Sequence, residues 1–403
     1  MANFTSNITT VMLNISTTIS TNVTMNCTNC TNATVGTIAA PSPCNNYTKD
    51  PGQIAYAVFL SLVMLLSILG NLLVVIAIAL SPRLRESPTN YFIASLSVSD
   101  LCYALFQSPI RIDQILRNRA FCFSKNVCQM FVITDIITSP ATISTLFVIA
   151  IDRFLCITKP FIYQEQMSRS KAKIIVCFVW LYACLWAGIS VFNWKSPHQP
   201  TIQVTITRVC FNKNPVFYLT SYFVVTLIPL VVMGVLYVII LQVAITQIRA
   251  IRATEVHLPQ QNQDENQNGR RKGKGSKGSR RTNREFKATA TLAIVYGAFF
   301  VCWMPLLVIN IVAQFAPNAF IALRTNKELF DFVYYTFVEI LPTISTAINP
   351  FIYSVFNRQF RAAFMAVMLR LVRRYDVLRR TTIVNELEIS RTDAARTMVS
   401  TTR

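Results

Sequence analysis

The chain contains few charged residues and almost no histidine. Asp, Glu, Lys and Arg make up 14% of its 403 residues, whereas a soluble domain carries about 25%. Much of the surface is therefore expected to avoid water. The two histidines, His198 and His257, both lie in loops between hydrophobic segments, and no residues cluster with the spacing of a metal site. This composition argues against an enzyme that uses histidine or a bound metal.

Long hydrophobic segments, in contrast, are abundant. Seven of them are close to or above the roughly 20 mostly apolar residues that a transmembrane helix needs. They are Ile54–Leu80, Tyr91–Pro109, Val127–Ile151, Ile174–Asn193, Pro215–Ile248, Ala288–Pro317 and Phe330–Phe356. The sequence therefore predicts an all-α membrane protein, with a seven-transmembrane helix bundle over residues 54–356.

The segments outside the predicted spans indicate how the chain is oriented. Residues 1–53 contain eight N-x-S/T sequons and no earlier hydrophobic run, which predicts a glycosylated extracellular tail without a cleavable signal peptide. The sequons begin at Asn3, Asn7, Asn14, Asn22, Asn26, Asn29, Asn32 and Asn46. Lys and Arg gather in the loops after the first, third and fifth spans, which places those loops and the 372–403 tail in the cytoplasm. We therefore expect a multi-pass protein of the plasma membrane.

The chain is strongly basic, with 38 Lys and Arg against 18 Asp and Glu and a net charge of +20. A nucleic-acid partner is disfavoured, because the charge is spread over inner loops and a tail beside apolar spans. Attraction to anionic lipid of the inner leaflet explains it better. The third inner loop, about 252–283, is polar and basic and lacks hydrophobic periodicity, so it is predicted to be disordered.

Five of the eleven cysteines lie in or near the predicted spans, and the other six lie on the outer side. Cys128, at the outer start of the third span, and Cys210, in the second outer loop, face an oxidising compartment and can form a disulfide. Four more cysteines also lie outside, and their pairing does not follow from the sequence. They are Cys27, Cys30, Cys44 and Cys122.

One predicted helix carries a charge near each side of the membrane. Asp135 and Arg153 are separated by five helical turns, so both project from the same face. At about 1.5 Å per residue they lie roughly 27 Å apart, close to the hydrocarbon thickness of a bilayer. This arrangement is typical of a receptor that transmits a signal across a membrane.

Each predicted span also contains a short motif. In chain order these are Gly70-Asn71, Leu96-Ser97-Val98-Ser99-Asp100, Asp152-Arg153-Phe154, Trp180, Pro229 with Tyr237, Cys302-Trp303-Met304-Pro305 and Asn349-Pro350-Phe351-Ile352-Tyr353. With these motifs, the chain resembles the rhodopsin-like (class A) G-protein-coupled receptors from about Ile54 to Leu371, and it is similar to their biogenic amine subgroup. The resemblance implies an extracellular ligand, a heterotrimeric G protein as partner, and no enzymatic activity.

The resemblance also implies a ligand site. In amine receptors an Asp at the position of Asp135 pairs with the ammonium group of the ligand. The expected ligand-binding residues are Asp135, Ser139, Ser221, Trp303, Asn310 and Glu339. The chain departs from the subgroup at Leu306 and Leu307, where two Phe are usual, and at Glu339, where Asn is frequent. A retinal-binding opsin is excluded, because no Lys occurs between Glu328 and Phe356.

Two alternatives stay open for the ligand. Asp135 and Glu339 together would form an acidic pocket for a strongly basic or dicationic ligand. Glu339 would instead leave a simple monoamine site if it paired with an outer Arg such as Arg111. A class A receptor for a basic peptide, or for another non-amine ligand, is the alternative function.

A switch toward the cytoplasmic side is implied as well. Arg153 has two candidate partners, the adjacent Asp152 and Glu285 at the start of the sixth helix. Releasing Arg153 from Glu285 would let the sixth helix move outward and open a cleft for the G protein. The other residues that match switch positions of the family are Ile143, Pro229, Phe299, Tyr237, Asn349, Pro350 and Tyr353.

The remaining expectations concern a polar core and the C-terminal region. Four residues match a sodium pocket of the family, namely Asp100, Thr142, Ser345 and Asn349, with Ser345 where Asn is more usual. A hydrated polar core without a specific ion is the alternative, and no other cofactor is expected. Residues 357–371 resemble the amphipathic eighth helix that lies along the membrane. The Ser and Thr residues of the tail are candidate targets for a receptor kinase and arrestin.

Overall fold

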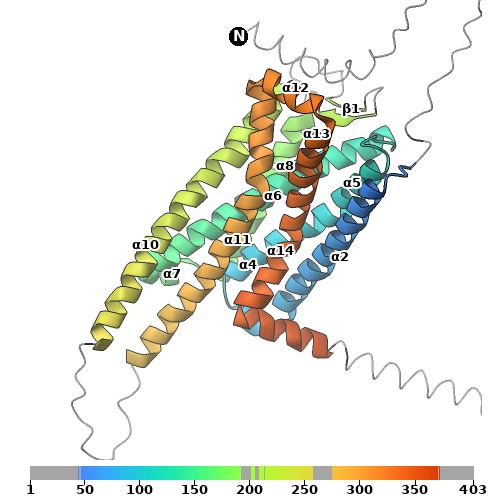
Figure 1. Cartoon of the computed structure of the whole chain (residues 1–403). Coiled ribbons are helices and arrows are strands. Elements are labelled where there is room, and N and C mark those ends of the chain that lie inside the picture. The colour runs from blue at the N-terminus through green and yellow to red at the C-terminus, as the bar shows by residue number, and fades with distance from the viewer. Residues whose placement is uncertain are drawn as a thin grey trace, which may run out of the picture.

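The computed structural model describes residues 44, 47–191, 201–204, 208–212, 214–256, 275–370 and 372. They form a bundle of long helices with one short hairpin near one end (Figure 1). All eight predicted glycosylation sites lie outside the described residues, and so do Cys27, Cys30 and the Ser and Thr residues of the tail.

Among the described residues, five helices are individually long and apolar enough to cross a membrane. They are α2 (Pro51–Leu80), α6 (Lys125–Thr158), α8 (Arg169–Val191), Ser221–Val243 within the fifth span and Thr289–Val312 within α11 (Gly275–Phe315). Large apolar side chains such as Leu66 and Leu185 are exposed on them. Such side chains suit helices that are surrounded by lipid, where the backbone satisfies its own hydrogen bonds.

The second and seventh spans are each built from three contiguous helical segments. The second consists of α4 (Thr89–Cys102), the π-helical η1 (Tyr103–Gln107) and α5 (Ser108–Leu116), and the seventh of α13 (Lys327–Val333), η3 (Tyr334–Ile340) and α14 (Leu341–Phe356). The fifth span has a similar interruption, with α9 (Pro215–Thr220), η2 (Ser221–Leu227) and α10 (Ile228–Val256). A π-helical turn accommodates an extra residue, because it bonds residue i to i+5. With these three, all seven predicted hydrophobic segments are helical.

Two predicted boundaries were wrong. The second crossing continues to Leu116, past the predicted end at Pro109, because η1 and α5 extend α4. The third inner loop was predicted to be disordered over 252–283, but α10 continues to Val256 and α11 begins at Gly275. Ala, Arg and Glu near the end of α10 are good helix formers, so the helix extends beyond its apolar part. Residues 257–274 lie outside the described part of the chain.

A short hairpin lies at the same end of the bundle as the start of α6. Strands β1 (Ile202–Val204) and β2 (Cys210–Asn212) are antiparallel, with Val204 opposite Cys210. A disulfide joins Cys210 to Cys128 in the first turn of α6. The predicted disulfide is confirmed, and it ties the outer loop to the helix bundle.

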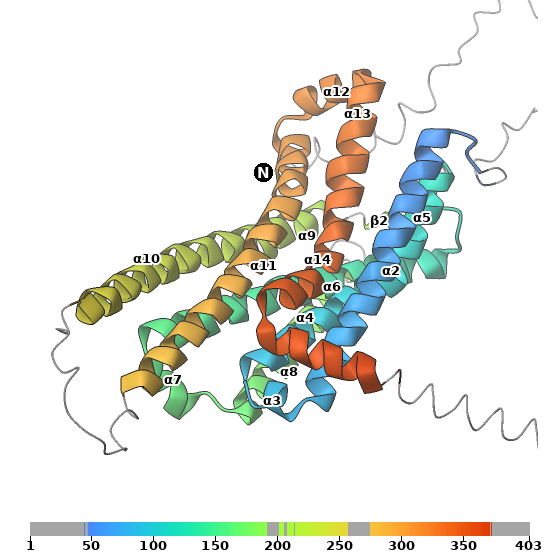
Figure 2. The same cartoon turned by 60° about the horizontal axis from the view of Figure 1, so that its bottom comes forward.

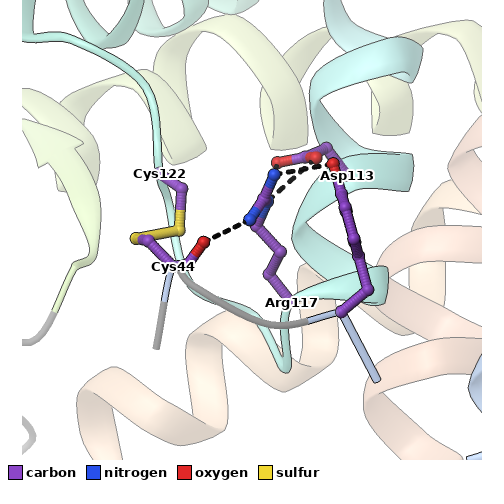
Figure 3. Close-up of a disulfide and its surroundings, with 5 residues drawn as sticks. Cys44, Asp113, Arg117 and Cys122 are labelled. Carbon is purple, nitrogen blue, oxygen red and sulfur yellow. Dashed lines mark hydrogen bonds and ion pairs between the residues drawn. A yellow bond between two sulfur atoms is a disulfide. The ribbon is translucent and has the colours of Figure 1, made fainter. Parts of the chain in front are cut away.

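A second disulfide ties the segment before α2 to the loop before α6. It joins Cys44 to Cys122, a pair that the sequence did not determine (Figure 3). Arg117 reinforces the same connection, because its guanidinium donates to the carboxylate of Asp113 at 3.1 Å and to the backbone oxygen of Cys44. The guanidinium also lies over the ring of Tyr47, with 4.1 Å between its central carbon and the ring centroid.

The chain turns after α14 into a further helix over residues 358–370, which runs across the end of the bundle (Figures 1 and 2). Its buried side chains recur at helical spacing, at Phe360, Ala363, Phe364 and Val367. The ring of Phe360 stacks on Tyr353 of α14, with 5.3 Å between the ring centroids. The structure thus has a helix where the amphipathic eighth helix was predicted.

Candidate functional site

A cavity of about 230 Å³ lies between the helices. Five of the six predicted ligand-binding residues line it, namely Asp135, Ser139, Ser221, Trp303 and Asn310. The two leucines that depart from the amine-receptor pattern, Leu306 and Leu307, line it as well. Ligand pockets of about 300–1,000 Å³ serve drug-sized molecules, so this cavity suits a small ligand.

Asp135 and Arg111 line one side of the cavity, and the carboxylate of Glu339 lies behind them. Nη1 of Arg111 on α5 lies 3.1 Å from Oε2 of Glu339 on η3, and Nη2 lies 4.0 Å from Oδ1 of Asp135 on α6. The hydroxyl of Tyr334 donates to the other oxygen of Glu339, with 2.9 Å between the two oxygens. Arg111 therefore connects three helical crossings.

The two carboxylates differ in exposure. The side chain of Asp135 is 42% exposed, whereas that of Glu339 is 5% exposed and does not line the cavity. Of the two arrangements considered for Glu339, the structure has the pair with Arg111. Each oxygen of Glu339 already accepts a hydrogen bond, one from Arg111 and one from Tyr334, and direct contact of Glu339 with a ligand stays a prediction.

Ser221 is oriented by a residue that the sequence analysis missed. The indole Nε1 of Trp186 on α8 donates to Oγ of Ser221, 2.8 Å away. A hydroxyl that accepts a hydrogen bond can still donate its own proton, so Ser221 can donate to an acceptor on a ligand. Tyr103, Trp186 and Tyr222 also line the cavity. A polar Trp N–H inside an apolar span was the available signal, because such a group needs a partner when it is buried.

Trp303 connects the cavity to the centre of the bundle. Its Nε1 donates to Oγ of Ser345 on α14 at 3.1 Å, and its ring stacks on Phe299, with 5.5 Å between the centroids. Phe299 and Ile143 belong to one buried core cluster, while Pro229 is partly buried. Trp303, at the floor of the cavity, is therefore in direct contact with Phe299, one of the residues that match the family's packing switch.

The four residues that match a sodium pocket are Asp100, Thr142, Ser345 and Asn349, and Trp303 contacts this group through Ser345. Nδ2 of Asn349 donates to Oδ2 of Asp100, 2.9 Å away, and the hydroxyl of Thr142 donates to Ser99. The hydroxyl of Ser345 accepts from Trp303 and donates to the backbone oxygen of Pro342. Carboxylate, amide and hydroxyl oxygens are ligands of hard cations, so the chemistry of this donor set fits sodium.

At the far end of α6, the structure describes Asp152 as a partner of Arg153. Nη2 of Arg153 lies 2.6 Å from Oδ2 of Asp152, and the guanidinium also contacts the Thr89 hydroxyl. The Tyr163 hydroxyl donates to the other oxygen of Asp152, at 2.7 Å. Burial next to this carboxylate raises the pKa of Tyr163, which keeps its hydroxyl protonated. The side chain of Glu285 lies outside the part that the structure describes.

The remaining switch residues lie on α10 and α14. The Tyr237 hydroxyl donates to the backbone oxygen of Leu292 on α11, 3.3 Å away. Tyr353 is fully buried, and its hydroxyl has no hydrogen-bond partner among the described residues. Pro350 packs so closely on α2 that a Cβ at Gly70 would lie 2.9 Å from its ring carbons. Glycine at this position therefore permits the contact between α2 and α14.

A family model for 7 transmembrane receptor (rhodopsin family) matches residues 70–353. The chain belongs to this family. The predicted family and the predicted bundle of seven helices are thereby confirmed, and the family consists of receptors rather than enzymes. As a member, the chain is a multi-pass protein of the plasma membrane.

Individual relatives of this rhodopsin-family receptor are amine receptors by name. The histamine H2 receptor of Cavia porcellus is 29% identical over 326 residues, covering 80% of the chain and 81% of the relative. The D(1A) dopamine receptor of Xenopus laevis is 32% identical and covers 76% and 70%. The 5-hydroxytryptamine receptor 7 of Xenopus laevis is 30% identical and covers 78% and 76%. The predicted resemblance to the biogenic amine subgroup is confirmed.

Proposed function

We propose that this receptor binds a small amine with one positive charge and activates a heterotrimeric G protein. The observation that carries the proposal is the half-exposed carboxylate of Asp135 in a small, otherwise largely apolar cavity. A charge in a low-dielectric site is costly unless it is paired. Arg111 lies 4.0 Å from Asp135 but also pairs with Glu339, so an ammonium group placed against Asp135 supplies the positive charge that would balance the second carboxylate.

The remaining polar groups would select among amines. Ser221 and Ser139 offer hydroxyls to ring substituents of the ligand, and Asn310 offers an amide. Trp303 would contact the ligand at the floor of the cavity. A displacement of its ring by the ligand would be transmitted to α14 through the hydrogen bond to Ser345. Relatives are named for histamine, dopamine and 5-hydroxytryptamine, and all three molecules carry an amine and a polar ring.

The proposal is tested by expressing the receptor in cells and recording second messengers in response to histamine, dopamine, 5-hydroxytryptamine and a panel of basic peptides. We expect one of the amines to activate the receptor. In the Asp135→Asn variant the response should fall by at least about 100-fold with surface expression retained, because a charge-assisted hydrogen bond in a desolvated site is lost. Asp113→Asn is the matched control, since Asp113 lies outside the cavity and pairs with Arg117.

Activation by peptides alone, or an Asp135→Asn variant with normal amine potency, would contradict the proposal. The first outcome would assign the cavity to a basic peptide. The second would remove Asp135 as the anchor.

Orientation and further partners belong to the same proposal. The end of the bundle that carries both disulfides would face outward with the glycosylated tail, since disulfides persist in oxidising compartments. At the other end, Met365, Met368 and Leu369 are exposed on the helix over 358–370 and would contact membrane lipid. The tail would interact with a receptor kinase and arrestin, and a sodium ion would bind at Asp100.

A further inference from the structure

Arg111 is a cation placed inside a site that is proposed to bind a cation. Its guanidinium lies 3.1 Å from a carboxylate oxygen of Glu339 and 4.0 Å from one of Asp135. The second distance exceeds that of a hydrogen bond. Asp135 is therefore attracted to Arg111 without being hydrogen-bonded to it, and its exposed oxygens stay accessible from the cavity.

The position of Arg111 is fixed by its surroundings. The central guanidinium carbon lies 5.9 Å from the ring centroid of Tyr103 and 5.7 Å from that of Phe131. Both distances permit a cation–π interaction. Its Nε is buried without a hydrogen-bond partner among the described residues. Charge and aromatic rings, more than a complete set of hydrogen bonds, hold this side chain in place.

The three charged groups determine the net charge that a ligand meets. Asp135 and Glu339 each contribute one negative charge, and Arg111 contributes one positive charge, so the group carries a single negative charge. In a low-dielectric cavity, a ligand with one ammonium group completes the balance, whereas a ligand with two leaves an uncompensated positive charge near Arg111. A ligand carboxylate is disfavoured, because Glu339 already pairs with Arg111.

We infer that Arg111, by neutralising Glu339, is the residue that makes the cavity selective for amines with one positive charge over amines with two. The inference rests on the proposed function, since it presupposes that the cavity binds an amine. Arg111 determines selectivity indirectly, because it neutralises the carboxylate of Glu339. Asp135, in contrast, contacts the ligand.

The inference is tested with two probes that differ by one ammonium group, pentylamine and 1,5-diaminopentane. Each competes against whichever of radiolabelled histamine, dopamine or 5-hydroxytryptamine binds the full-length receptor in cell membranes. The wild type should prefer pentylamine. In Arg111→Met, which retains an apolar side chain of similar length, the ratio of the two affinities should shift toward the diamine by about tenfold or more.

Two further variants separate the charge of the site from the fold. Glu339→Gln leaves Arg111 and Asp135 as a neutral pair, and the affinity for the labelled amine should fall about tenfold or more. The double variant Arg111→Met with Glu339→Gln again carries one negative charge, so it should recover most of the amine affinity and the wild-type preference. Arg117→Met is the matched control, because it removes a cation that lies outside the cavity and should leave the preference unchanged.

The outcomes distinguish the inference from the function on which it rests. If none of the three labelled amines binds the wild type, both are overturned. If an amine binds and the Arg111→Met receptor keeps the wild-type ratio, the inference alone is overturned. A double variant whose amine affinity stays as low as that of Glu339→Gln also overturns it, since charge balance would then not explain the loss. Surface labelling of each variant supplies the receptor number that the affinities require.

Discussion

The indole Nε1 of Trp303 donates a hydrogen bond to the Ser345 hydroxyl across 3.1 Å, although the two residues belong to different helices. Trp303 lines the cavity, and Ser345 is among the residues that match a sodium pocket. The bond therefore joins the floor of the ligand site to the polar core of α14. It also holds α11, the helix that is predicted to move outward on activation, against α14.

Ser345→Ala is expected to raise ligand-independent signalling about fivefold. A net hydrogen bond contributes about 1 kcal/mol, and its loss shifts the equilibrium away from the arrangement that contains it. Second-messenger output without ligand, normalised to surface expression, measures the change. Ser345→Thr retains a hydroxyl and should stay near the wild type; an equal rise in both variants would argue against the hydrogen bond as the cause.

Asp152→Asn should raise ligand-independent signalling about tenfold or more. The amide keeps the size of the side chain but removes the charge that holds Arg153 next to Thr89, and charge-assisted hydrogen bonds contribute about 1.5–3 kcal/mol each. The measurement is again second-messenger output without ligand. Asp113→Asn makes the same change in an ion pair at the opposite end of the bundle and should leave this output unaltered. Basal signalling at the wild-type level in Asp152→Asn would exclude this ion pair as a restraint on the resting state.

Cys44→Ser should lower the melting temperature of the solubilised receptor. The disulfide closes a loop of 78 residues, and a native disulfide typically contributes about 2–5 kcal/mol. Cys122→Ser should have the same effect, and the double variant should be no less stable than either single variant. Cys177→Ser, at a free and exposed cysteine on α8, serves as the control. Unequal effects of Cys44→Ser and Cys122→Ser would show that the two cysteines do not act as a pair.

Phe161→Ala should reduce G-protein activation about fivefold or more while agonist affinity without G protein stays constant. Phe161 lies on α7 (Pro160–Gln166) and is 86% exposed, and α7 also contains Tyr163, which binds Asp152. A large apolar side chain that a partner buries contributes more than about 1 kcal/mol. Nucleotide exchange on purified G protein measures the effect. Phe178→Ala on α8 is the control, as a second exposed Phe within a membrane-spanning helix; equal losses in both variants would mean that Phe161 has no special role.

The hydrophobic segments predicted the seven spans, because the surface of a span that meets lipid must be apolar. A long apolar segment is therefore visible in the sequence for each span. These segments did not predict the π-helical segments, because nothing in the residues of η1 or η3 distinguishes a π-helical turn from a regular helical one. They also predicted the end of the second crossing too early, at Pro109, since a Pro in the first turn of α5 is compatible with a continuing helix when π-helical turns precede it.

The cavity was predicted in part. Asp135 stood out because an acid inside an apolar span requires a reason. Trp186 and Tyr222 did not, since aromatic residues occur both on faces that meet lipid and on faces that line a cavity; the indole N–H of Trp186 indicated a polar partner but not which one. The sequence suggested Arg111 as a partner of Glu339 but did not decide between this ion pair and a Glu339 that faces the ligand. The decision depends on how α5 and η3 are rotated about their axes. The pairing of Cys44 with Cys122 depends likewise on a loop path that cysteine positions alone do not define.

The π-helical turns bear on how such receptors diverge. Arg111 follows η1 by one helical turn, and Glu339 lies within η3. One residue changes the direction of a helical side chain by about 100°, so deleting a single residue from η1 would rotate Arg111 away from Glu339 on η3 while every motif of the span stayed intact. The insertion or deletion of one residue within these turns can thus change which ligand a receptor binds during evolution, while every family motif stays the same.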